Sequence, residues 1–261
     1  MTPGAPLVEM RGIVKAFGAV EALRGADLTL GVAEVLGLVG DNAAGKSTLM
    51  KILTGVHRPD AGEIVFEGRA VAFHSPRDSR ALGIEMIYQN LALAPNLDVV
   101  GNVFLGRERT KRVLPRVMEW LDERRMDAET RKILDRLKIR MDSVRAPVAR
   151  LSGGQQQAVA IARAVSFNAR VVVMDEPTAS LAVKEVGKVL ALVSELRAKQ
   201  VSVILISHRL QDVFTVADRV MVLRGGRGAL DTRIGDTTMD EVVKYIVGAD
   251  TGGLSHLASG R

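Results

Sequence analysis

An α/β fold is predicted by three features of the sequence. Apolar runs of strand length occur at 34–39, 170–174 and 201–206, and a polar or glycine-rich turn follows each run. Helical periodicity with one apolar side appears at 183–199, between two of these runs. Because strands that alternate with helices pair in parallel, we expect a parallel sheet covered by helices.

The composition narrows the class of protein. The chain has 261 residues and is 47% apolar, which is ample for one or two compact cores. A net charge of +6 fits nucleic acid, an anionic membrane surface or an anionic ligand as partner, but 3% aromatic residues are few for stacking bases. Without cysteine there is no disulfide and no thiolate metal site. With no signal-peptide core, and apolar runs shorter than the ~20 residues of a spanning helix, we expect a soluble protein that reaches a membrane through a partner.

The stretch 34–55 passes from a strand through a small-residue turn into a helix. The turn matches the pattern G-x-x-x-x-G-K-[ST], and its residues are Gly40, Asp41, Asn42, Ala43, Ala44, Gly45, Lys46, Ser47 and Thr48. Small residues let backbone N–H groups close around phosphate oxygens at a helix N-terminus. Lys46 can reach the outer phosphates, and the Ser47 hydroxyl can hold Mg²⁺. The alternative is a turn that only connects two elements. The strand–turn–helix context favours a nucleoside triphosphate site.

Phe17 lies in a turn between two predicted strands, 7–14 and 26–30. It is either a platform for an adenine ring or a half-buried side chain that closes a hairpin, and its spacing favours neither. Further on, a hairpin over 62–73 and a short helix over 75–82 are expected. The strand at 83–88 ends in Gln89, which would place this amide at the ligand edge of an open α/β sheet.

Strand patterns stop at residue 90, and helical periodicity replaces them as far as residue 150. We expect helices in this insertion, one of them with the apolar positions 113, 114, 117, 120 and 121 on one side. Residues 107–150 hold fourteen lysines and arginines against eight acids, so they carry the whole positive excess of the chain. The charge could mark a face for nucleic acid or lipid, but a solvated helix face is the more common origin.

A second glycine-rich turn follows at 151–157, LSGGQQQ, at the start of a helical stretch that runs to 165. Small residues at a helix N-terminus make this turn a second candidate anion site. The alternative is an ordinary helix cap by Ser152.

Polar side chains also follow two buried strands. Asp175 and Glu176 end the apolar run 170–174, and two acids in this position are costly unless they face a cation or a cleft. With phosphate and Mg²⁺ at Lys46 and Ser47, Asp175 is placed to hold the metal and Glu176 to act as a base for water. The alternative is that both acids cap the next helix. His208 follows the run 201–206 and would join the same group of strand-end side chains.

Taken in order, GDNAAGKST, Gln89, LSGGQQQ, VVVMDEP and His208 resemble the nucleotide-binding cassette of ABC transporters, from about residue 7 to residue 248. The resemblance implies a P-loop NTPase (RecA-like) core with an antiparallel β subdomain and an inserted α-helical subdomain. The chain 1–261 would be a single cassette. Its α/β core would comprise 1–89 and 156–248, its helical subdomain 90–155 would end in the signature turn, and 249–261 would be a flexible tail.

The same resemblance implies ATP and Mg²⁺ as cofactors and gives each site residue a role. Gln89 would serve the metal and the water together with Ser47 and Asp175. Glu176 would be the general base and His208 the γ-phosphate sensor, while Phe17 would stack on adenine. Nucleotide is also implied to contact the signature residues Ser152, Gly153, Gly154 and Gln155. Ser152 and Gly154 would touch the γ-phosphate held by a second cassette, so the active form would be a two-fold homodimer.

Three stretches resemble those of the ATPase subunits of bacterial monosaccharide importers: the phosphate-loop stretch, NVFLGRE at 102–108 and EPTASLAVKEV at 176–186. The chain looks like the single-cassette form of these subunits. This resemblance implies an ATPase that energises uptake of a sugar such as fructose, ribose or xylose. The protein would be a peripheral protein at the cytoplasmic face of the bacterial inner membrane. There it would bind integral permease subunits, which receive the sugar from a periplasmic sugar-binding protein. Candidate permease contacts are apolar residues within 90–105, namely Leu91, Leu93, Leu97, Val99 and Val100.

Two alternatives remain open. One is a non-transport ABC ATPase acting on nucleic acid or the ribosome, but only 61 residues separate Gln89 from Leu151, too few for the long coiled coils of DNA-repair relatives. Ribosome-acting relatives usually carry paired cassettes. The other is a different P-loop enzyme such as a small-molecule kinase, against which LSGGQ and Glu176 argue. We therefore expect no nucleic-acid partner.

Two positions depart from the family pattern. Ala43 stands where many members have glycine, which should leave the loop intact if φ at Ala43 is negative. Ala182 stands where many cassettes have an aspartate that links two active sites.

Overall fold

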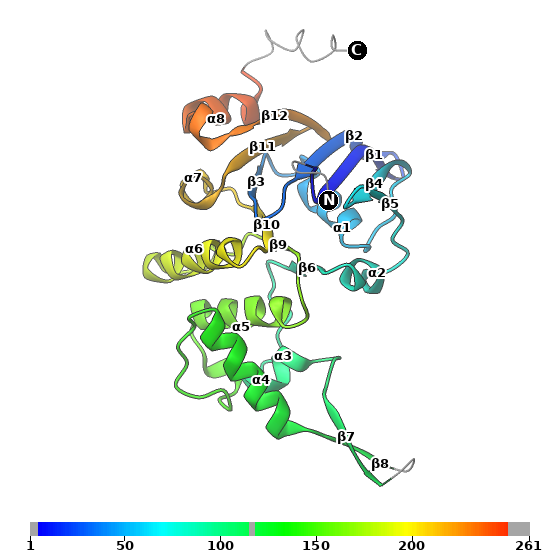
Figure 1. Ribbon diagram of the computed structural model, residues 1–261. Helices are drawn as coiled ribbons and strands as arrows, with labels where there is room; N and C mark the ends of the chain where they lie inside the picture. The colour runs from blue at the N-terminus through cyan, green and yellow to red at the C-terminus, as the bar shows by residue number, and fades with distance from the viewer. Residues whose placement is uncertain (1–4, 115–117, 250–261) are drawn as a thin grey trace.

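The larger of the two main sheets has six strands in the order β12-β11-β3-β10-β9-β6 (Figure 1). The computed structural model describes residues 5–114 and 118–249. The strands are β3 (Val35–Val39), β6 (Ile84–Ile87), β9 (Val171–Asp175), β10 (Ser202–Ile206), β11 (Arg219–Arg224) and β12 (Arg227–Arg233). All are parallel except β12, and Ile206 lies beside both Leu38 and Asp175, so the carboxyl ends of the central strands are level. The predicted parallel sheet is confirmed.

A second sheet is antiparallel, in the order β2-β1-β4-β5. Its strands are β1 (Val8–Phe17), β2 (Val20–Leu30), β4 (Ala61–Phe66) and β5 (Arg69–Val71). Helix α1 (Lys46–Leu53) follows the phosphate loop and buries Leu49, Met50, Ile52 and Leu53. These side chains join a core cluster that also includes residues of β1, β2 and β3. The first turn of α1 is thereby held against both sheets.

The described chain also contains α-helices and two 3-10 helices. They are α2 (Pro76–Ala81), α3 (Val99–Phe104), α4 (Glu123–Arg136), η1 (Val148–Arg150), α5 (Gly153–Val165), α6 (Val183–Ala198), α7 (Leu210–Val216), η2 (Ile234–Asp236) and α8 (Met239–Val247). In Figure 1, α3, α4 and α5 lie together at the end of the molecule away from β1 and β2. Among the helices of the described ranges, none is both long and apolar enough to cross a bilayer.

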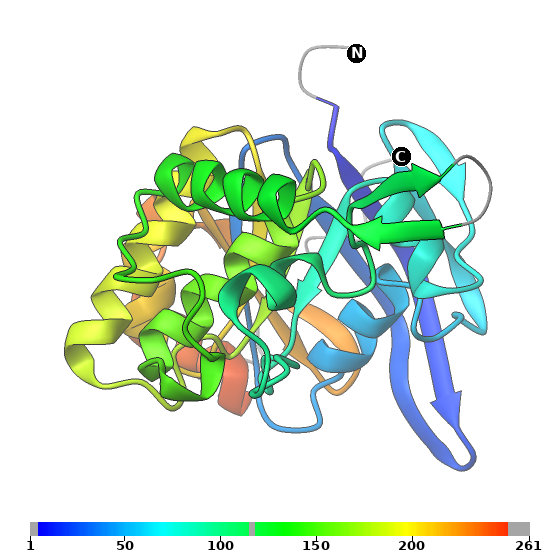
Figure 2. The ribbon, with the colours of Figure 1, turned by 90° about the horizontal axis from the view of Figure 1, so that it is seen from below.

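The expectation of a helix over 113–121 is wrong. The structure has a hairpin of β7 (Thr110–Leu114) and β8 (Met118–Leu121) here, which projects from the helical part in Figures 1 and 2. Trp120 is 56% exposed and pairs with Lys111 across the hairpin. The apolar residues therefore do not form a buried helix face, and a run rich in β-branched and aromatic residues forms strands. Position 117 lies outside the described residues.

Part of the charge in the insertion is ion-paired at the surface. Arg109 and Arg125 both contact Glu129, at 3.3 and 2.8 Å, and Arg145 contacts Asp98 and Asp127 at 3.2 and 3.1 Å. This pattern is that of a solvated helix face, the more common of the two explanations offered by the composition.

Smaller differences from the expected elements also have physical reasons. Strand β12 was not predicted, because its residues are mostly polar and lie at the sheet edge. Thr238 caps α8 and Gly248 ends it at φ +83°, and the Glu241 carboxylate accepts from the Thr237 hydroxyl, so a Thr238–Glu241 capping box, which the spacing of these residues would allow, does not form. Of the predicted tail at 249–261, all but Ala249 lies outside the described residues.

Candidate functional site

Four polar segments meet because they follow neighbouring parallel strands. The phosphate loop follows β3, His208 follows β10, Asp175 and Glu176 end β9, and Gln89 comes two residues after β6. These strands are consecutive in the sheet in the order β3-β10-β9-β6. Side chains far apart in the sequence are therefore placed along one edge, the usual ligand edge of an open α/β sheet.

The phosphate loop depends on its two glycines. Gly40 has φ +146° and Gly45 has φ +102°. A Cβ at Gly40 would lie 2.1 Å from the Leu223 carbonyl oxygen, and one at Gly45 would lie 2.6 Å from that of Ala22. The loop therefore packs directly on β2 and β11 backbone. No other residue type fits at either end of this turn.

Lys46, the first residue of α1, folds back over its own loop. Its Nζ donates to the carbonyl oxygens of Gly40, at 2.6 Å, and Asp41, at 2.8 Å. Burial lowers the pKa of the ammonium, although the carboxylates of Glu176, Asp175 and Asp41 oppose that effect. A half-buried cation is thus held at the centre of the loop by neutral oxygens, which phosphate oxygens could replace.

Ala43 corrects one expectation. Its φ is +65°, in the left-handed region, whereas the loop was expected to be unstrained only if φ were negative. A residue with a Cβ costs roughly 1–2 kcal/mol in this conformation. Ala43 is exposed, so its methyl group meets no steric conflict and the cost lies in the backbone. The loop keeps its turn but carries local strain.

Two carboxylates adjoin at the end of β9. Burial raises the pKa of Asp175, and the neighbouring Glu176 charge raises it further, while Lys46 and a hydrogen bond from Ser47 act in the opposite direction. The nearby positive charge is therefore too little to offset the burial of the Asp175 carboxylate and its repulsion by Glu176. Across the residues that the structure describes, no three His, Cys, Asp or Glu side chains cluster as a metal site. A metal that needs few protein ligands and arrives with phosphates fits this donor set, which is the usual behaviour of Mg²⁺.

Glu176 faces His208. Nδ1 of His208 lies 2.7 Å from Oε2 of Glu176, and the two side chains are 65% and 14% exposed. Oε2 is buried and, apart from this close ring nitrogen, has no hydrogen-bond partner in the described part of the chain. Glu176 also has φ +52°, a strained value for a residue with a side chain. No pattern in the neighbouring sequence predicts the buried Oε2 or the positive φ of Glu176.

Gln89 lies beside a small cavity of about 290 Å³ that it shares with Glu176 and with Gly153 of the signature turn. Gln157, from the same turn, also lines it, and its Nε2 is buried with no hydrogen-bond partner among the described residues. The structure thus brings the Gln89 loop, the end of β9 and the start of α5 around one polar space.

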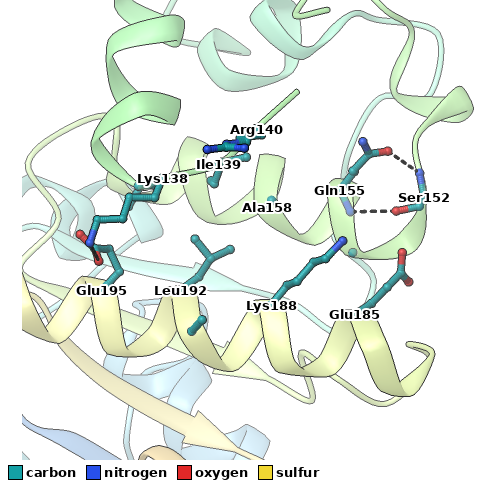
Figure 3. A pocket seen from close by; sticks show the side chains of 13 residues that line it. Lys138, Ile139, Arg140, Ser152, Gln155, Ala158, Glu185, Lys188, Leu192 and Glu195 are labelled. Atoms are coloured by element: carbon teal, nitrogen blue, oxygen red, sulfur yellow. Dashed lines mark hydrogen bonds and ion pairs between the residues drawn. The ribbon is translucent and has the colours of Figure 1, made fainter. Parts of the chain in front are cut away.

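Ser152 caps α5. Its hydroxyl accepts from the Gln155 backbone N–H at 3.3 Å, and the side-chain oxygen Oε1 of Gln155 accepts from the Ser152 N–H at 3.0 Å, as the dashed lines in Figure 3 show. The cap that sequence reasoning offered as an alternative therefore forms. At the same turn, a Cβ on Gly154 would come within 3.0 Å of the Glu185 side chain.

The capped turn opens onto a second pocket of about 840 Å³ between α5, α6 and the segment 137–140 (Figure 3). Lys138 pairs with Glu195 across it at 2.9 Å. Arg140 and Lys188 also line the pocket and have no ion-pair partner within the described ranges. Because Glu185 and Glu195 also line the pocket, its three cations leave an excess of only one positive charge there.

Phe17 lies at the end of β1 and is 44% exposed. Its ring meets that of His57 edge to face, with centroids 5.2 Å apart, and Lys15 Nζ lies 5.6 Å from its centroid. The ring therefore has neighbours but remains partly open to solvent. His57 was not identified from the sequence, since it follows α1 without any pattern that marks it.

A phosphate loop closed by two positive-φ glycines, an acid pair and a histidine at adjacent strand ends, and a capped LSGGQ turn define a P-loop ATPase of the ATP-binding cassette class. A family model described as ABC transporter matches residues 23–179, and the chain belongs to this family. It is 46% identical over 240 residues to a xylose/arabinose import ATP-binding protein of Sulfolobus acidocaldarius, covering 92% of this chain and 93% of that one. It is 43% identical to a fructose import ATP-binding protein of Rhizobium meliloti, covering 94% and 95%.

Solved structures agree with this assignment. A nucleotide-free ATP-binding cassette from an ABC transporter superposes with a TM-score of 0.79 at 27% identity, covering 94% of this chain and 96% of that one. A dimeric bacterial ABC transporter cassette superposes with a TM-score of 0.72 at 22% identity, covering 87% and 98%. At that identity the dimeric structure shows the shared fold alone. The predicted fold class and the predicted family are confirmed.

Proposed function

We propose that this chain is the ATP-hydrolysing subunit that energises an importer of a monosaccharide such as fructose, ribose or xylose. The observation that carries the proposal is the row of strand ends that aligns the Lys46 loop, His208, Glu176 and Gln89. The relatives support the sugar assignment, because two chains named for xylose/arabinose and fructose import align with 92% or more of this one.

The phosphate loop binds the triphosphate in this proposal. Backbone N–H groups over 40–48 surround the phosphates, and Lys46 exchanges two loop carbonyls for phosphate oxygens. Phe17, partly open to solvent, stacks on adenine. Ser47, Gln89 and Asp175 would hold Mg²⁺, which when bound neutralises phosphate charge. The shortage of positive charge beside Asp175 supports that assignment.

Glu176 acts as the base for the attacking water. Its Oε2 is buried and has no hydrogen-bond partner in the ranges that the structure describes, so it is available to accept a proton. His208 keeps Nδ1 towards Glu176, which leaves Nε2 to donate to the γ-phosphate. Glu176 and His208 lie side by side, so that Glu176 contacts the water while His208 contacts the γ-phosphate.

A second copy of the chain completes each site. Ser152, Gly153, Gly154 and Gln155 supply backbone donors and a positive helix end for the γ-phosphate held by the partner. Closure on ATP and opening after hydrolysis would move integral permease subunits, which a periplasmic sugar-binding protein supplies. The chain would then lie peripherally at the cytoplasmic face of the inner membrane. Of the suggested permease contacts, Leu97 is exposed, whereas Val99 and Val100 are buried and pack the insertion instead.

The variant Ser152→Arg tests the shared site. It should abolish hydrolysis without weakening ATP binding by the isolated monomer, because the bulky side chain blocks only the partner's approach. Ser143→Arg, the same change at an exposed serine outside the signature turn, is the control. Unchanged ATP-dependent dimerisation of Ser152→Arg in light scattering would refute the shared site.

Transport is tested with membranes. The chain should co-purify with membranes when integral partners are present, and ATPase stimulation in liposomes with those partners and a panel of sugar-loaded binding proteins would identify the sugar. A non-transport ATPase would remain unstimulated by every sugar.

A further inference from the structure

Arg163, near the end of α5, holds the loop that follows Gln89. Its Nη2 donates to the carbonyl oxygen of Leu91 at 2.8 Å, and its Nη1 donates to that of Ala92 at 2.7 Å. We infer that Arg163 is a positioning residue, which fixes the Gln89 loop to the helix that the signature turn begins. This inference rests on the proposed function, because the group it positions is the proposed Mg²⁺ and water ligand Gln89.

Among the residues that the structure describes, no carboxylate forms an ion pair with Arg163. Burial lowers its pKa, and the Glu85 charge partly opposes this. Glu85, however, pairs with Arg107 at 2.6 Å and with Arg80 at 3.7 Å. Arg163 therefore directs a largely buried guanidinium at two neutral carbonyls. Burying a cation is costly. A buried guanidinium that binds only loop carbonyl oxygens therefore indicates that the position of this loop is important for function.

The loop is tied to the helical part at two successive points. Besides the Arg163 contacts, the buried Asn102 of α3 accepts from the Ala94 N–H at 2.7 Å and donates to the Ala94 carbonyl at 3.0 Å. Ala92, whose carbonyl oxygen Arg163 binds, has φ +49°, a strained value that persists only where the surroundings fix it.

Close to Gln89 the loop does not pack directly on α5. The cavity of about 290 Å³ lies there, between residues 89–93 and the first turns of the helix. The Arg163 fork connects the two elements further along α5, beyond this cavity. A shift of α5, on contact of its signature turn with a partner, would pull the carbonyls of Leu91 and Ala92 and so move Gln89.

The test compares Arg163→Lys and Arg163→Met with the parent chain. Methionine removes every donor, and lysine keeps the charge but cannot form the two-pronged contact. We expect kcat to fall about tenfold and the Mg²⁺ concentration for half-maximal hydrolysis to rise, as for groups that orient metal ligands. ATP affinity without Mg²⁺ should be unchanged. Arg131→Met, which removes a surface pair with Asp127, is the control and should alter none of these values.

A double-mutant cycle separates positioning from general damage. In a Gln89→Ala background, Arg163→Met should cause no further change in Mg²⁺ dependence, because its target is gone. A full additional loss in that background, or unchanged Mg²⁺ dependence in the single variants, would overturn the inference. If Arg163→Met fails to fold, Arg163→Lys completes the cycle. An inactive parent chain would instead count against the proposed function.

Discussion

The hydroxyl of Thr178 donates to Oδ2 of Asp212 over 2.6 Å, and these residues are only 1% and 4% exposed. Thr178 comes two residues after Glu176, and Asp212 comes four residues after His208. One buried hydrogen bond therefore ties together the two segments whose side chains meet at the candidate base. Arg209 Nε, at 3.5 Å, is a second and weaker neighbour of the same carboxylate.

Thr178→Val should destabilise the protein by about 2–3 kcal/mol, since it keeps the shape of the side chain but leaves a buried carboxylate without its main donor. Urea unfolding measures the loss. Thr178→Ser retains the hydroxyl and should cost clearly less. Equal losses for the two variants would show that packing, rather than the hydrogen bond, is what Thr178 provides.

Glu176→Gln should reduce kcat by ~10²–10⁴-fold, because glutamine cannot accept the proton of the attacking water. ATP should still bind, since the phosphate loop is untouched. Steady-state hydrolysis measures kcat, and equilibrium nucleotide binding measures the affinity for ATP. Glu63→Gln, at an exposed carboxylate of β4, is the matched control. Turnover of Glu176→Gln near the parent value would remove Glu176 from the mechanism.

Ala43→Gly should stabilise the protein by about 1 kcal/mol, because glycine adopts the left-handed conformation without the cost of a Cβ. Ala33 has φ +53° in the turn before β3, away from the loop, so Ala33→Gly should give a similar gain in thermal unfolding. Ala43→Gly alone should also change nucleotide affinity. If neither substitution raises the melting temperature, backbone strain is not what these positions share.

The sequence alone was sufficient to predict which polar side chains lie at the carboxyl edge of the parallel sheet. Gln89, Asp175 and His208 each follow an apolar run, and parallel pairing then requires that they share one edge, whatever the rest of the chain does. The buried face of α1 was predictable for a similar reason, since helical periodicity and burial coincide there. Both results depend on patterns that repeat within a few residues.

Contacts between residues far apart in the sequence are not accompanied by a local pattern of this kind. Arg163 reaches a loop about seventy positions earlier in the chain, and Thr178 reaches Asp212 across two elements, so nothing near either residue marks the contact. The positive φ of Glu176 is likewise imposed by the fold rather than by its neighbours. The β7–β8 hairpin was missed because a short apolar run fits a helix or a strand equally well by spacing.

Asp175→Asn should stabilise the nucleotide-free protein at pH 7. The pKa of Asp175 is raised in the folded state by burial and by Glu176, so ionisation at neutral pH favours unfolding. Stability linked to this group is fully present below about pH 4, the ordinary pKa of aspartate, and is lost as pH rises through the folded pKa. The advantage of the variant should therefore shrink on acidification in thermal melts. An advantage that stays constant with pH would exclude an electrostatic origin.

Ala182→Asp should have two separable effects. Ala182 is the N-cap of α6, with extended backbone angles and no side-chain cap, so an aspartate there should add about 1 kcal/mol of stability. It also restores an acid at the position that would link two active sites, so the Hill coefficient for ATP hydrolysis should change more than the maximal rate does. Ala182→Ser supplies a cap without charge and should reproduce only the stability gain. If Ala182→Ser alters the Hill coefficient equally, the effect comes from helix capping, and an unchanged coefficient in Ala182→Asp would show that the acid does not couple the sites in this chain.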